Sequence, residues 1–100
     1  FYKTKHLISR MKERVISEGE LLDVIKHGWL IEYYVEENEL NETFILVGYT
    51  RKKRPLHLIL SHEGEEIYLV TVYDPRSMTW KWDDGYQVRK CFCKDEEEEL

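Results

Sequence analysis

The sequence contains few of the residues that cross-link a small fold or interrupt regular structure. Its 100 residues include only two cysteines, two prolines and five glycines. Cys91 and Cys93 form a Cys-x-Cys pair, which supplies two thiolates where a structural zinc site needs four ligands. We therefore interpret them as two free thiols and expect no metal site in this chain. Zinc shared with a partner or with a second copy is the alternative.

Long apolar runs are missing as well. No run approaches the roughly 20 residues of a membrane-spanning helix, and the first residues, FYKTKH, lack the apolar region of a signal peptide. The P-loop, the GxGxxG motif, the nucleophile-elbow serine and the paired histidines of metalloproteases are also absent. We expect a soluble, cytoplasmic protein that uses no cofactor and has no membrane partner.

The charge is unevenly distributed along the chain. The net charge is −5, but Asp95 to Glu99 are five consecutive acids, and residues 1–94 carry equal numbers of basic and acidic side chains. Basic residues concentrate in Lys3 to Arg14 and in Arg51 to Arg54. The overall acidity therefore does not exclude a nucleic-acid partner. We expect one folded domain over residues 1–94 and a disordered acidic tail over residues 95–100.

Two helices are predicted at the N-terminus. Apolar residues recur at helical spacing over Thr4 to Val15, where Thr4 can cap the first helix. Ser17-x-x-Glu20 is a capping box that predicts the start of the second helix. Gly28 is expected to end that helix in the left-handed conformation.

Four antiparallel strands are predicted after the helices. Trp29 to Glu36 and Thr43 to Thr50 are rich in aromatic and β-branched residues, as strands are. The next two strands form a hairpin around the polar turn at His62 to Glu66. The sequence therefore predicts an α+β fold, with two N-terminal helices packed on one face of a four-stranded antiparallel sheet. After Pro75 we expect a loop with a short helix or an edge strand.

Side-chain alternation in the hairpin separates its two faces. Leu56, Leu58 and Leu60 share one face, and His57 lies on the other. In the second strand of the hairpin, the same alternation predicts two faces. One face carries Tyr68, Val70 and Val72, and the other carries Ile67, Leu69, Thr71 and Tyr73. A histidine and a tyrosine therefore lie in the most apolar part of the chain, just after the basic loop.

The polar residues of this chain suit one metal-free reaction. RNA can be cut when a base deprotonates the 2′-hydroxyl, cations hold the phosphate and an acid protonates the leaving oxygen. Histidine is the natural acid or base near neutral pH, arginine binds phosphate in a planar fork, and tyrosine can stack on a base. Each residue also has a structural explanation, as a hydrogen-bonded core histidine, a packed tyrosine or a solvated basic loop.

A series of short motifs adds a family resemblance. The motifs are His6-x-x-x-Arg10-Met11-x-x-Arg14, Gly28-x-x-Ile31-Glu32, Leu46-x-Gly48-Tyr49, Arg54-Pro55-Leu56-His57, Val70-Thr71-x-Tyr73-x-Pro75, and Trp82 followed by Arg89-Lys90. In this order they make the chain similar to a small bacterial and archaeal family of unknown function, which resembles the RelE, BrnT and MqsR ribonuclease toxins. The resemblance implies a RelE-like fold, metal-free mRNA cleavage, on the ribosome or free, and neutralisation by a cognate antitoxin protein.

This reasoning gives a first hypothesis, a metal-free endoribonuclease of the toxin–antitoxin type. The expected catalytic residues are His6, Arg10, His57 and Tyr73, with His57 as general acid or base. The expected nucleic-acid-binding residues are Arg14, Arg51, Lys52, Lys53, Arg54 and Arg89.

The alternative is a module on the same fold that binds RNA or protein without catalysis. A purely protein-facing role, through the acidic segment Glu32 to Glu42 or the tail, is a third possibility. The position of His57 distinguishes the first two hypotheses, because a side chain sealed in the core cannot act on RNA. The oligomeric state is left open by the sequence.

Overall fold

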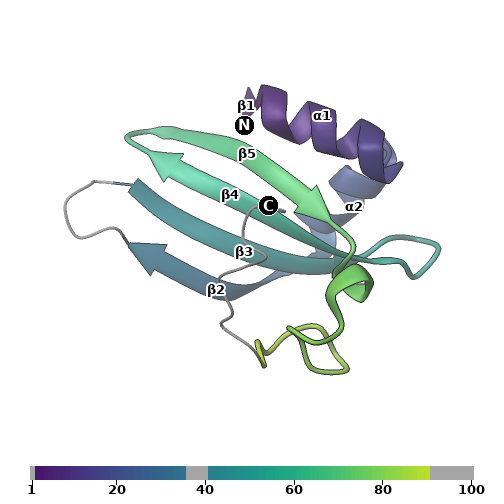
Figure 1. The fold of residues 1–100 in the computed structure, drawn as a ribbon. Helices are drawn as coiled ribbons and strands as arrows, with labels where there is room; N and C mark the ends of the chain where they lie inside the picture. Colours follow the sequence, from purple (N-terminus) through teal and green to yellow (C-terminus); the bar gives the residue numbers. More distant parts are fainter. Residues whose placement is uncertain (1, 36–40, 91–100) are drawn as a thin grey trace.

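The computed structural model describes residues 2–35 and 41–90, which form a five-stranded sheet and two α-helices (Figure 1). The elements in chain order are β1 (Tyr2–Lys3), α1 (Lys5–Arg14), α2 (Glu18–His27), β2 (Trp29–Val35), β3 (Asn41–Tyr49), β4 (Pro55–Glu63), β5 (Glu66–Tyr73) and the 3₁₀ helix η1 (Pro75–Met78). The strand order is β1-β5-β4-β3-β2. Neighbouring strands are antiparallel except β1, which is parallel to β5.

The predicted α+β class is confirmed, but the predicted sheet of four antiparallel strands is wrong in detail. The fifth strand, β1, pairs Tyr2 with Tyr68 and Lys3 with Leu69. Immediately after it, the Thr4 amide donates a hydrogen bond to the Leu69 carbonyl at 3.2 Å. A strand of two residues leaves no periodic pattern in a sequence, so only its pairing with β5 reveals it.

The helix starts follow the sequence closely, whereas the helix ends do not. Thr4 caps α1, and the capping box of Ser17 and Glu20 is fully formed at the start of α2, as predicted. The left-handed residue is Val15, at the end of α1, with φ 53°. Gly28 has φ −77°, so the predicted left-handed stop is wrong. Gly28 is required for space, since a Cβ there would lie 2.5 Å from the Val24 carbonyl oxygen and 2.7 Å from that of Val47.

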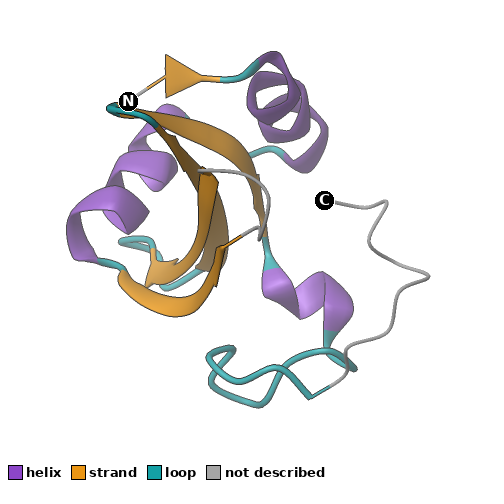
Figure 2. Ribbon diagram, turned by 90° about the vertical axis from the view of Figure 1, so that its left-hand side faces the viewer, coloured by secondary structure: helices purple, strands orange, loops and turns teal. Residues whose placement is uncertain are grey.

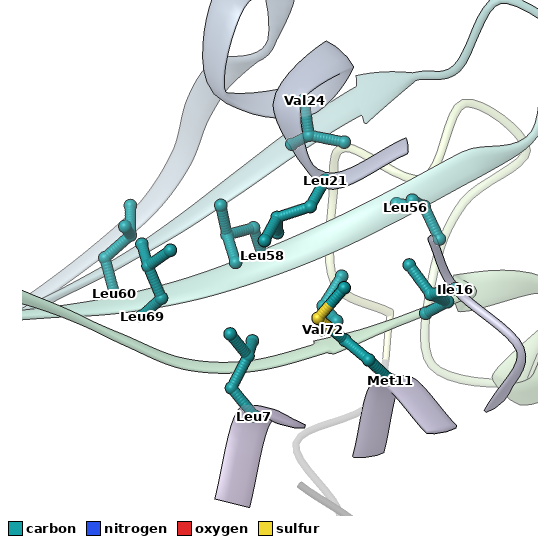
Figure 3. Close-up of a cluster of buried hydrophobic side chains, with 10 residues drawn as sticks. All are labelled: Leu7, Met11, Ile16, Leu21, Val24, Leu56, Leu58, Leu60, Leu69 and Val72. Carbon is teal, nitrogen blue, oxygen red and sulfur yellow. The ribbon is translucent and has the colours of Figure 1, made fainter. Parts of the chain in front are cut away.

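The main core lies between the two helices and one face of the sheet (Figure 3). Leu56, Leu58 and Leu60 of β4 point into it together, as the predicted alternation requires. The other buried members of this core are Leu7, Met11, Ile16, Leu21, Val24, Leu69 and Val72. Burial of these side chains, at about 1.5–3 kcal/mol each, holds α1 and α2 on the sheet.

A β-bulge in β5 changes the predicted faces of the hairpin. Ile59 pairs with Thr71 but Leu60 pairs with Leu69, so Val70 has no partner across the ladder. Leu69 consequently joins Val72 in the helix-side core, and the predicted separation of these two residues is wrong. The extra residue shifts the side-chain alternation by one position, which a strict period of two cannot anticipate.

The segment after β5 covers part of the opposite face of the sheet, away from the helices (Figure 2). Pro75–Met78 forms η1, and a bridge between Trp82 and Arg89 closes the loop that follows. A second core cluster forms there around Ile45, Ile59, Tyr73 and Met78. Within residues 2–35 and 41–90, no helix is long and apolar enough to cross a membrane. The predictions for Cys91, Cys93 and the acidic tail lie outside the described residues.

We predict that Gly28→Ala lowers the free energy of unfolding by about 1–3 kcal/mol, because its methyl group would overlap two backbone carbonyl oxygens. Gly19→Ala is the matched control in the same helix. Its Cβ would approach only the Ser17 hydroxyl, at 3.8 Å, and alanine in a helix stabilises by about 0.5–1 kcal/mol. Urea unfolding of both variants checks the opposite signs, and equal effects would contradict the assigned role of Gly28.

Candidate functional site

A pocket of about 530 Å³ lies at the carboxyl end of β5, and we call it the β5-end pocket. Three of the residues predicted from sequence line it: Arg14 from α1, Arg54 from the loop before β4, and Tyr73 from β5. The other described lining residues are Asp74, Ser77, Met78 and Trp80. The structure thus brings part of the predicted site together where α1, β5 and η1 meet.

The predicted basic stripe on α1 reaches this pocket only at its end. Arg14 donates a hydrogen bond from Nη1 to the Val72 carbonyl at 2.9 Å, which ties the last turn of α1 to β5. Arg10, one turn earlier, forms an ion pair with Glu13 at 2.6 Å. His6 is exposed a further turn away, and neither His6 nor Arg10 lines the pocket. Four residues of helix span about 6 Å, so the stripe extends away from the site.

Arg54 is occupied by groups of the protein itself. Its guanidinium donates hydrogen bonds to the Arg14 carbonyl at 3.1 Å and the Val15 carbonyl at 2.9 Å. It also contacts the Glu20 and Asp74 carboxylates, each at 3.3 Å. Because these acceptors come from α1, α2 and the end of β5, Arg54 connects three elements. Its predicted role as a phosphate ligand stays untested, but two carboxylates already compensate its charge.

His57 is fully enclosed by the fold, with no exposed surface. Its Nδ1 lies 3.2 Å from the Tyr73 hydroxyl and its Nε2 lies 2.7 Å from the Tyr86 carbonyl oxygen. A carbonyl oxygen only accepts, so Nε2 carries the proton and Nδ1 accepts from the tyrosine. Trp82 packs its ring against the imidazole, with the ring centroids 4.3 Å apart.

Burial also controls the protonation of this pair. Loss of hydration lowers the pKa of His57 to about 4, and burial raises the pKa of Tyr73 well above its ordinary value. Both groups are therefore neutral at neutral pH. A general acid or base must contact the proton that it transfers, and no substrate can reach the His57 ring in this arrangement. His57 and Tyr73 do lie together, as predicted, but around a closed space.

Arg89 belongs to a second ion-pair cluster, next to the Trp82 ring that packs on His57. Its guanidinium binds the Glu32 carboxylate through two hydrogen bonds of 2.9 and 3.0 Å. It also lies over the Trp82 ring, 4.6 Å from the ring centroid. The Tyr34 hydroxyl donates to the same carboxylate. Arg89 thus fastens the segment after β5 to β2. Arg89 is not among the residues that line the β5-end pocket.

The predicted basic rim lies elsewhere too. Arg51, Lys52 and Lys53 are exposed at the turn between β3 and β4. The Arg51 guanidinium lies 3.7 Å from the Asp23 carboxylate, which anchors the turn to α2. The ten predicted site residues therefore divide among the β5-end pocket, the α1 stripe, the closed cluster at His57 and this exposed turn.

Four residues that shape these places are absent from the predicted site residues: Glu32, Asp74, Trp80 and Trp82. Glu32 and Trp82 occur in the motif series, but no role at a site is predicted for them from the sequence. Equal numbers of acids and bases in residues 1–94 were a usable signal, since they imply carboxylate partners for the arginines. Nothing in the sequence separates the exposed Trp80 from the buried Trp82. In the part of the chain that the structure describes, no group of three or more His, Cys, Asp or Glu side chains is placed to hold a metal ion.

We predict that the stability of the fold decreases between about pH 7 and pH 5 because of His57. The folded pKa is lowered, so the unfolded chain binds the proton more tightly and stability is lost as the pH falls below about 6.5. The expected loss at about pH 5 is about 2 kcal/mol, and it levels off near the folded pKa. Urea unfolding against pH, for wild type and His57→Leu, measures it. An unchanged slope in His57→Leu would assign the effect to other groups.

Comparison with known proteins places the chain in a family without assigning a function. No curated protein and no solved structure matches it. The family described as "Domain of unknown function (DUF4258)" matches residues 4–74, from the cap of α1 to the wall of the β5-end pocket. Since the match covers more than half of the sequence, the chain belongs to the DUF4258 family.

Proposed function

We propose that the chain is a non-catalytic RNA-binding module. It binds single-stranded RNA at the β5-end pocket, and His57 does not cleave that RNA. One observation carries the proposal: Arg14 and the exposed ring of Trp80 border the same pocket, which Tyr73 also lines. Trp80 is 54% exposed, so its ring is accessible to a base at the wall of the pocket. An arginine beside an open aromatic ring is the combination that binds a phosphate and stacks on its base.

The surroundings of the pocket favour a strand with negative charge. Arg14 brings its guanidinium to the wall of the pocket, where it donates to the Val72 carbonyl, and a guanidinium binds phosphate in a planar fork. Arg76 is exposed on η1, which contributes Ser77 and Met78 to the pocket lining, and its guanidinium forms an ion pair with the Asp74 carboxylate at 2.7 Å. The guanidinium groups at the pocket add a salt-sensitive part to the affinity of an anionic ligand.

Metal-free mRNA cleavage of the RelE type, with neutralisation by a cognate antitoxin, is the alternative proposal. It needs a proton-transferring group in contact with the scissile phosphodiester. His57, the expected group, is enclosed between Tyr73, Tyr86 and Trp82. The burial of His57 therefore favours binding over cleavage, and the RelE-like relationship rests on the motif resemblance alone.

We predict that Trp80→Ala weakens binding of single-stranded RNA roughly tenfold, since a base that stacks on an aromatic ring contributes about 1–3 kcal/mol. Trp29→Ala is the matched control, because Trp29 is 43% exposed on β2 and does not line the pocket. Fluorescence anisotropy with a labelled mixed-sequence oligonucleotide, at low and high salt, measures both affinities. Equal losses in the two variants would contradict the proposed site.

The same RNA tests cleavage directly. Wild type and His57→Ala are incubated with it, with and without ribosomes, and the products are separated by gel electrophoresis. We expect binding by wild type and no cleavage under either condition. Cleavage by wild type that is lost in a folded His57→Ala protein would overturn the binding proposal and support the enzyme.

A further inference from the structure

A second and larger hollow, of about 890 Å³, lies on the other side of Arg54. It is bordered by the end of α1, the first part of α2 and the turn before β4, and we call it the α1–α2 groove. Met11 and Ile16 contribute its buried floor. Val15 and Leu22 border it as well, and these apolar side chains are 80% and 47% exposed.

The charged residues of the α1–α2 groove are mostly basic. Lys12, Lys26, Arg51 and Lys52 are exposed around it. The acids among the described lining residues, Glu20 and Asp23, are engaged within the fold. The Glu20 carboxylate accepts hydrogen bonds from the Ser17 amide and from Arg54, and Asp23 accepts from the Arg51 amide at 3.2 Å. The groove therefore combines an apolar interior with a positive rim.

Val15 is held there in an unfavourable conformation. Its φ of 53° and ψ of 56° are left-handed, a region that glycine adopts freely and that costs other residues about 1–2 kcal/mol. Branching at Cβ makes valine an unusual choice at such a position. Because the side chain is largely exposed, packing within this fold does not offset the strain. A bound partner would bury this exposed apolar side chain and so offset the strain. Strained residues are known to concentrate at binding sites.

We propose that the α1–α2 groove binds an acidic peptide segment that carries large apolar side chains, supplied by a partner protein. The apolar side chains would pack between Val15 and Leu22, and the acidic groups would face Lys12, Lys26 and the basic turn. Charge complementarity selects an acidic partner over a basic one. None of the described residues that line the groove is aromatic, so they offer no stacking surface to nucleic-acid bases, in contrast to the β5-end pocket.

Binding of a synthetic peptide tests the proposal. The probe is a short fluorescein-labelled peptide of glutamates with leucines at helical spacing, and its control has serine in place of each leucine. Leu22→Ser should weaken binding of the leucine peptide roughly tenfold, since one buried leucine is worth about that factor or more. Ile8→Ser is the matched control, because Ile8 is 42% exposed on α1 and lies outside the groove.

A lysine pair tests the rim in the same assay. Lys12→Gln removes a cation that borders the groove, and Lys5→Gln removes an exposed cation from the same helix outside it. We expect weaker peptide binding, by a few-fold at low salt, only in Lys12→Gln. Equal binding of the leucine and serine peptides would overturn the proposal. Loss in Leu22→Ser and Ile8→Ser alike, or no binding by wild type, would overturn it too.

Val15→Gly separates docking from stability. Glycine removes the left-handed strain, so the variant should unfold at a higher temperature than wild type. The same change removes an apolar contact, so the peptide should bind several-fold more weakly to this more stable protein. If the variant binds the peptide as tightly as wild type does, Val15 does not contact the peptide. That result would overturn the proposal that the apolar side chains of the peptide pack between Val15 and Leu22. RNA that competes with the peptide for the groove would show instead that the rim is a nucleic-acid surface.

Discussion

The guanidinium of Arg54 is the contact on which both candidate sites depend. It holds the carbonyl of Arg14, the last residue of α1, and that of the cap residue Val15, together with the carboxylates of Glu20 and Asp74. Helix ends leave carbonyls without partners inside the helix, and a cation is the favoured group to satisfy them. Two carboxylates then compensate that cation in a partly buried position. A side chain that resembles a phosphate ligand in the sequence thus organises the fold around it.

The same principle explains why a structural cluster can resemble an active site. His57, Tyr73, Arg89 and Glu32 are residue types that catalyse reactions, and they are also the types that satisfy one another when they are buried. Here each makes a contact within the fold, through the Tyr73 hydroxyl, the Tyr86 carbonyl and the Arg89–Glu32 pair. These contacts fasten the segment after β5 to the face of the sheet away from the helices. The motif series on which the expected likeness to ribonuclease toxins rests includes these same residues, so a shared fold accounts for that likeness as well as a shared activity does.

A structural feature could be predicted from the sequence when neighbouring residues determine it, and not when contacts between distant segments do. The helix starts at Thr4 and Ser17 and the inward face of Leu56, Leu58 and Leu60 follow from neighbouring residues, and they are confirmed. The strand β1, the bulge at Val70 and the space requirement at Gly28 arise from pairing and packing between distant segments. The partners of Arg54 and Arg89 are likewise distant in the chain, at Glu20, Asp74 and Glu32. The sequence can thus predict which residues have the chemistry that a site needs. It cannot predict which of them are already bound to distant groups of the same fold.

Arg54 borders both proposed sites, and this bears on whether binding at one site would affect binding at the other. Arg14 borders the β5-end pocket and Val15 borders the α1–α2 groove, and Arg54 binds the carbonyls of both residues. Coupling between two sites requires an element with two arrangements that each ligand favours differently. Arg54 has its acceptors on three elements at once, and moving the end of α1 would break contacts to α2 and Asp74 together. A connection of this kind favours a single arrangement, so RNA and peptide should bind independently, except through the charge that each brings near the other.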